Sequence, residues 1–368
     1  MEKTKDYISD ELIVEFRKAV NEKNFAYFYF RNRNGKNQWN VICSCTDWIT
    51  VSIRSMMHSG ALSNNIDVRV MQVFSLISSI DIVYESVMTL HSVIKGTGGR
   101  VSPFKGSNVI FRDSSGLDDD LYFKELRSQF GAHPVNLGNP GKDQWFASWP
   151  YDSTGGGCDF EIRLYSNRIG IPDRTIKLHL NQLYEFLHER YMYLNELASE
   201  LKNRLMQFIN HCRNTPIRTV GEPYEQLLIL REESAKRLDL EGVNCHLDDL
   251  IRLFSVSLVD EKMRNKERNL KNDLRQLINE YQIILQNGWF DLDMQYIDLL
   301  GTDNLYSKMN YELPKLYNWL YSGHFDPFVD LYFGKLNEID KWGYDFSKHD
   351  LSEITLLKLL LLDRELVS

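Results

Sequence analysis

Long stretches of this chain carry apolar residues every three or four positions, and this spacing constrains the fold more than any other feature. The clearest stretch runs from Ile66 to Ile94. A β-strand would need an apolar residue at every second position, so the spacing predicts an amphipathic helix. The apolar positions on one side of this helix are Val70, Phe74, Ile77, Val83, Val87, Leu90 and Ile94.

The same period predicts helices over most of the remaining chain. The expected helices cover residues 10–23, 39–56, 118–130, 175–214, 222–238, 246–287, 303–320, 325–340 and 350–364. Asn34-Gly35 is compatible with a hairpin turn, although the spacing that begins at Trp39 favours a helix after it. The clear β signal is the alternating sequence on either side of the glycine-rich turn 153–157. We therefore expect a mainly α protein, a helical bundle with one inserted β-hairpin near 145–166.

A chain of 368 residues exceeds the size at which one hydrophobic core usually stops growing. Thr215-Pro216 closes the predicted helix 175–214, so we place a domain boundary there. Residues 1–215 would form the helical domain with the hairpin. Residues 216–368 would form a second, all-helical region of unknown role.

Composition excludes several classes of protein. The five cysteines are an odd, scattered set, which argues against a disulfide framework and a structural metal site. The net charge of −8 argues against a general nucleic-acid binder. The first residues lack the apolar run of a signal peptide, and the apolar run at 356–362 is too short to span a bilayer. No nucleotide-binding, zinc-protease or serine-hydrolase signature occurs, so we expect a cytoplasmic protein without cofactor or metal.

One short segment, LRSQFGAHP, combines an arginine and a histidine at the end of a predicted helix. Five residues separate Arg127 from His133. On an unbroken helix six positions rotate a side chain by about 240°, so the two side chains would not share a face. Gly131 permits the helix to end between them, and Pro134 disfavours the helical conformation of His133. The sequence therefore provides the break that would let the two side chains converge.

This segment resembles the signature of the HEPN superfamily, in which a polar residue usually follows the arginine and a histidine comes four to six residues later. It also looks like an Abi-type branch whose motif ends in Ala-His-Pro. Ser128 stands where Asn, Asp or His is more usual. The resemblance implies an α-helical bundle over about 1–215 and a ribonuclease of bacterial abortive-infection, toxin–antitoxin or CRISPR systems. It also implies a homodimer whose two motifs line one cleft, and it leaves room for an antitoxin or defence partner.

The residue types suit RNA cleavage without a metal. A histidine of near-neutral pKa can take the proton of a ribose 2′-hydroxyl, and an arginine can offset charge on the phosphate. We therefore predict a metal-independent endoribonuclease with Arg127 and His133 as catalytic residues and Ser128 in support. Arg163 and Arg168 are candidate RNA contacts.

Other interpretations remain open. Arg127 could simply pair with Glu125 or Asp120, and His133 could satisfy a helix C-terminus. The domain could also be a catalytically silent module that binds RNA or protein, or a helical scaffold. There are two further Arg/His pairs. Arg204 and His211 are predicted to lie in a packed helix, and Arg54 and His58 are predicted to form a surface pair. Asp118 to Asp120 are expected to be charges at a helix N-terminus, with magnesium binding a less favoured alternative.

Overall fold

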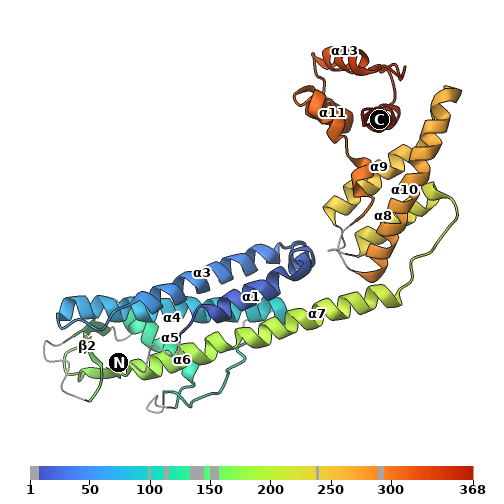
Figure 1. Cartoon of the computed structure of the whole chain (residues 1–368). Helices are drawn as coiled ribbons and strands as arrows, with labels where there is room; N and C mark the ends of the chain where they lie inside the picture. The colour runs from blue at the N-terminus through green and yellow to red at the C-terminus, as the bar shows by residue number, and fades with distance from the viewer. Residues whose placement is uncertain are drawn as a thin grey trace. The chain divides into compact units, whose positions relative to one another are not determined.

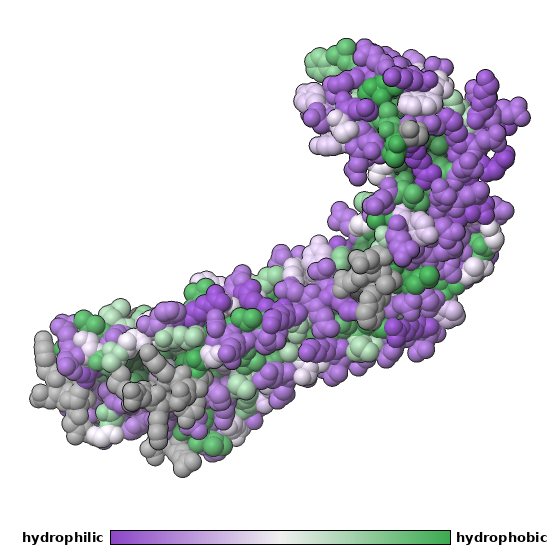
Figure 2. Space-filling model, in the orientation of Figure 1, coloured by the Kyte–Doolittle hydropathy of each residue, from purple (hydrophilic) through white to green (hydrophobic). Residues whose placement is uncertain are grey.

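The computed structural model describes residues 8–97, 101–111, 116–132, 145–149, 157–237, 240–288 and 294–367. The chain forms two compact units, Met1–Leu205 and Met206–Ser368, and each has its own hydrophobic core. The division lies within helix α7, upstream of Pro216. The protein is mainly α-helical with one small antiparallel sheet, which confirms the predicted fold class (Figure 1). On the face shown in Figure 2, hydrophilic residues cover most of both units.

Unit 1, Met1–Leu205, is built around helix α4, which packs against α3 and α6. Asn65 caps α4 by accepting hydrogen bonds from the amides of Asp67 and Val68, and Gly96 ends it in the left-handed conformation (φ 71°). The helices of this unit are α1 (Glu11–Asn21), α2 (Phe25–Phe30), α3 (Gln38–His58), α4 (Ile66–Lys95), α5 (Asp119–Leu126), α6 (Leu180–Met192) and the first half of α7 (Leu194–Asn214).

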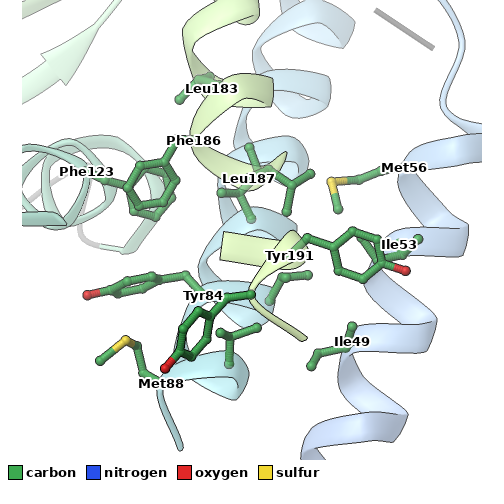
Figure 3. Packing of buried hydrophobic residues seen from close by; sticks show 14 of the residues in the cluster. Ile49, Ile53, Met56, Tyr84, Met88, Phe123, Leu183, Phe186, Leu187 and Tyr191 are labelled. Carbon is green, nitrogen blue, oxygen red and sulfur yellow. The ribbon is translucent and has the colours of Figure 1, made fainter. Parts of the chain in front are cut away.

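Aromatic side chains from three helices form the centre of this core. Figure 3 shows Phe123 of α5 against Phe186 of α6, with Tyr84 of α4 beside them. The Phe123 and Phe186 rings stack with centroids 4.4 Å apart. Tyr191 ties in α1, because its hydroxyl accepts from the Ile13 amide at 3.0 Å and donates to the Ser9 carbonyl at 2.9 Å. Burial and specific hydrogen bonds together hold the bundle in one arrangement.

Among the described helices, α4 alone is long and apolar enough to cross a membrane. Of its most apolar stretch, 56% is buried within unit 1. The buried part of α4 belongs to the core of unit 1, which accounts for the high hydropathy of this helix.

The β structure is larger than predicted. Strands β1 (Trp145–Ser148), β2 (Phe160–Ser166) and β3 (Arg174–Leu178) form one antiparallel sheet in the order β1-β2-β3. The predicted hairpin corresponds to β1 and β2. The prediction of one helix over 175–214 was wrong: β3 pairs with β2, with Ile176 opposite Ile162, and the helical part is divided at Tyr193 into α6 and α7. Pairing with a strand outweighed local helical spacing in this segment.

Asn34 and Gly35 form a tight turn with positive φ angles of 54° and 70°, closed by a bridge between Arg33 and Lys36. In the described chain around it, no strands extend from this turn, because α2 precedes it and α3 follows. The helical interpretation of the segment after the turn was correct.

The regular secondary structure of unit 2, Met206–Ser368, is entirely helical among its described residues. Besides the end of α7, its helical elements are α8 (Pro223–Lys236), α9 (Glu241–Ser255), α10 (Glu261–Asn287), the 3-10 turn η4 (Ile297–Leu300), α11 (Asp303–Lys308), α12 (Glu312–Ser322), α13 (Val329–Ile339) and α14 (Ser352–Glu365).

Two predicted helices of this region are divided. Residues 246–287 form α9 and α10, because Glu267 accepts a hydrogen bond from the Leu258 amide at 2.8 Å and Asp260 caps the second helix. Residues 303–320 form α11 and α12, which are separated at Met309.

Candidate functional site

The α-helical part of α5 ends at Leu126, and Arg127 begins a π-helical turn, η3 (Arg127–Ala132). The Nε atom of Arg127 lies 3.0 Å from Oδ2 of Asp81 on α4, and 45% of the arginine side chain is exposed. π-helical turns are rare and often occur at functional sites. The chain therefore changes helical geometry at Arg127 and holds an accessible arginine side chain there. The predicted end of the helix before His133 is not tested, because η3 continues to Ala132 and His133 lies outside the described residues.

Asp81 is the charged partner that the sequence did not reveal. Its side chain is 14% exposed. Burial raises the pKa of Asp81 above its ordinary value, whereas the nearby Arg127 guanidinium opposes that shift. The earlier alternative, in which Arg127 pairs with Glu125 or Asp120, is not what the structure shows. The carboxylate of α4 instead orients the arginine.

Phe130 anchors η3 in the core. It is 2% exposed, and its ring lies 6.4 Å from that of Phe74 on α4 and 5.8 Å from that of Phe160 on β2. Both contacts have tilted or edge-on geometry, which aromatic pairs favour. This residue, which sequence reasoning did not single out, fixes η3 between α4 and the sheet and so limits the positions open to Arg127.

Of the other predicted site residues, Ser128 lies beside Arg127 and Arg163 lies on the sheet. His133 lies outside the described residues. Ser128 is exposed on η3, next to Arg127. Arg163 lies on β2 with its Nε 3.4 Å from Glu161. Because side chains alternate along a strand, Arg163 projects from the face opposite the one that Phe160 packs against Phe130.

Arg168 is an exposed residue just after β2. The described structure does not bring Arg163 together with Arg127, and Arg168 lies beyond the end of β2.

The three consecutive aspartates before the motif have three separate structural roles. Asp118 caps α5 by accepting from the Leu121 amide at 2.8 Å. Asp119 is fully buried and accepts from the backbone of residues 109–111. Asp120 forms an ion pair at 2.8 Å with the fully buried Arg190.

The prediction that all three are merely charges at a helix N-terminus was wrong for Asp119 and Asp120. Their partners lie in different directions. In the described ranges, no group of three or more His, Cys, Asp or Glu side chains is arranged to hold a metal ion.

The arginines of the two alternative Arg/His pairs form ion pairs with carboxylates of unit 1. Arg204 lies 2.9 Å from Glu200 and donates to the Tyr29 hydroxyl at 3.2 Å, so it links α7 to α2, whereas His211 is exposed. Arg54 pairs with Asp10 at 2.9 Å on the surface, and the His58 ring bonds the Arg54 carbonyl. Neither arginine combines the exposure of Arg127 with a change to π-helical geometry.

No family model matches the sequence, and no curated protein or solved structure gives a significant match to it.

Proposed function

We propose that unit 1 is a HEPN-like, metal-independent endoribonuclease of the bacterial abortive-infection or toxin type, active on cytoplasmic RNA as a homodimer. The observation that supports this proposal most is the state of Arg127. Its side chain is 45% exposed, yet its Nε atom is paired with Asp81 at 3.0 Å, at the start of a π-helical turn. An arginine that is both accessible and oriented is suited to binding a phosphate in a fixed position.

In the proposed reaction, His133 takes the proton of a ribose 2′-hydroxyl. The 2′-oxygen then attacks the adjacent phosphorus, and the bond to the 5′-oxygen of the next nucleotide breaks. The products are a 2′,3′-cyclic phosphate and, after proton transfer to the leaving oxygen, a 5′-hydroxyl. Arg127 stabilises the charge that builds on the phosphate oxygens, and Ser128 can donate a hydrogen bond to one of them. The second histidine of a dimer would supply the acid that protonates the leaving group.

RNA cleavage by the full chain tests these roles. Arg127→Ala and His133→Ala should each lower the single-turnover rate by about 100-fold or more, because each removes a group that acts in the transition state. The matched controls are Arg54→Ala and His58→Ala, an exposed pair in the same unit. Wild-type rates in both motif variants would refute the assignment.

Product analysis tests the chemistry independently. Cleavage should continue in excess EDTA, should leave a 2′,3′-cyclic phosphate or 3′-phosphate, and should stop at a 2′-deoxy residue. Because one histidine must be neutral as the base and the other protonated as the acid, the rate should pass through a maximum around pH 6–7. Products with 5′-phosphate ends that form only with added magnesium would contradict the mechanism even if the protein is a nuclease.

Asp81 is a positioning residue in this proposal. Asp81→Asn keeps the side-chain size but removes the charge that orients Arg127, so kcat should fall while KM for RNA changes little. Asp81→Glu should recover part of the rate. A stability change without a kcat effect would assign Asp81 a purely structural role.

Assembly separates the proposal from its alternatives. Light scattering over a range of concentrations should give a dimer, since one arginine and one histidine leave the reaction without an acid. A strict monomer that cleaves RNA would contradict the shared site. RNA binding without cleavage by the wild type would favour the second interpretation, a catalytically silent binding module.

A further inference from the structure

We propose that unit 1 binds an uncharged, largely apolar small molecule in a pocket formed by the end of α3, the first half of α4 and the start of α6. We call it the α3–α4 pocket. Its volume is about 560 Å³, within the range of small-molecule sites. The apolar part of its wall includes Met56, Met57, Leu62, Met71, Leu76 and Tyr184.

The lining defines the class of ligand. No charged side chain is among the described residues that line the pocket, whose polar groups are hydroxyls and one amide. A charged group that entered would lose its hydration without gaining an ionic partner, which is costly. Hydroxyls from Ser55, Ser75 and Ser79 can instead hydrogen-bond a neutral polar group. The preferred ligand is therefore an apolar body with at most an uncharged polar group such as a hydroxyl.

One wall of the pocket is held open by hydrogen bonds. The Gln72 side chain accepts from the Ser63 amide at 2.8 Å and donates to the Ala61 carbonyl at 3.2 Å. Arg69 donates to the Ser63 carbonyl at 2.7 Å. These bonds fix the segment between α3 and α4 against α4, so the pocket is formed before any ligand arrives. Binding to a preformed site avoids the entropy of ordering a loop.

Two apolar side chains at the rim of the pocket are exposed to solvent. Met71 is 61% exposed and Val68 is 50% exposed, although both line the pocket. A bound apolar molecule would cover them, and this burial is favourable. Methionine side chains are flexible and polarisable, so Met56, Met57 and Met71 can adapt to ligands of different shapes.

The α3–α4 pocket is separate from the Arg127 site. Ser75 and Ser79 lie four positions apart and share one face of α4. Asp81, the partner of Arg127, follows Ser79 by two positions and so projects about 160° away. Ligand binding therefore does not depend on the proposed nuclease activity, and the two can be tested apart.

The test uses the full chain and the neutral fluorophore N-phenyl-1-naphthylamine, whose emission rises in an apolar environment. We expect saturable binding of one probe per chain. Ser75→Phe should fill the pocket and raise the Kd at least about tenfold. The matched control is Ser44→Phe, which places the same side chain at an exposed serine of α3 outside the pocket. Ser79→Phe is a second filling variant in case Ser75→Phe does not fold.

Competition tests the charge preference. Neutral 1-naphthol should displace the probe, whereas 1-naphthalenesulfonate, which has the same rings and a negative charge, should be at least about tenfold weaker. Equal displacement by both compounds would overturn the inference. So would equal probe binding by the filling variants and Ser44→Phe. A wild-type dimer that becomes monomeric in Ser75→Phe, without probe binding, would instead show that a second chain covers the pocket.

Discussion

Asp119→Ala should destabilise unit 1 strongly, because this one carboxylate organises the segment that precedes α5. The residue is fully buried. Its oxygens accept from the amides of Val109, Ile110 and Phe111 at 3.1, 3.2 and 3.0 Å and from the Ser107 hydroxyl at 3.1 Å. The Asp119 amide in turn donates to the Ser107 carbonyl at 2.7 Å. The segment 107–111 is therefore held in place by hydrogen bonds to one carboxylate.

The magnitude follows from the donors that lose this acceptor. Ile110 and Phe111 are buried, so their amides cannot turn to water without opening the segment. A buried donor left without its acceptor costs about 1–3 kcal/mol. With a smaller loss from the partly exposed donors, the expected change in the free energy of unfolding is about 3–5 kcal/mol. That is a large part of the usual stability of a domain.

The adjacent Asp118 provides the control. It also lies at the start of α5, but its hydrogen bonds from the Leu121 and Gly106 amides are exposed to solvent, so Asp118→Ala should cost only about 1 kcal/mol. Urea unfolding followed by tryptophan fluorescence would measure both variants. Amide exchange at Ile110 and Phe111 would locate the effect. The reasoning is refuted if Asp119→Ala is no more destabilising than Asp118→Ala, or if exchange at these amides is unchanged.

Three further predictions concern single side chains. Gly288→Ala should lower the free energy of unfolding in urea by about 2–3 kcal/mol, because a Cβ at φ 58° would lie 3.1–3.2 Å from side chains of α7. The control is Gly323→Ala, at φ 63° with open space around it, which should cost only about 1 kcal/mol. Burial lowers the pKa of His91, whose ring lies 2.8 Å from the Tyr193 hydroxyl. The free energy of unfolding should therefore be highest above pH about 6.5 and should fall as the pH decreases through the folded-state pKa. His91→Gln should flatten this dependence in urea midpoints measured at pH about 7.5 and about 5. Arg204→Ala should lower stability by about 1–2 kcal/mol yet leave the RNA cleavage rate of folded protein unchanged, and a rate loss would move the site to α7.

Much of the helical architecture follows from local signals in the sequence. The apolar period of 66–94 predicted α4 nearly to its ends, because one buried face requires that spacing and because Asn65 and Gly96 supply the caps. For the site, Gly131 and Pro134 predicted only that the helix ends before His133, and the change to π-helical geometry at Arg127 was not predicted. These signals act within one or two helical turns, so no tertiary contact is needed to recognise them.

Tertiary structure decided what depends on residues far apart in the chain. Arg174–Leu178 became a strand because β2 was available to pair with it. Asp118, Asp119 and Asp120 are the same residue type in succession, yet one caps a helix, one holds a loop and one pairs with the buried Arg190. Asp81 met Arg127 only because α4 and η3 pack together. Composition and spacing determine which segments become helices, whereas the partner of a charged side chain is set by which elements lie beside it once the core has formed.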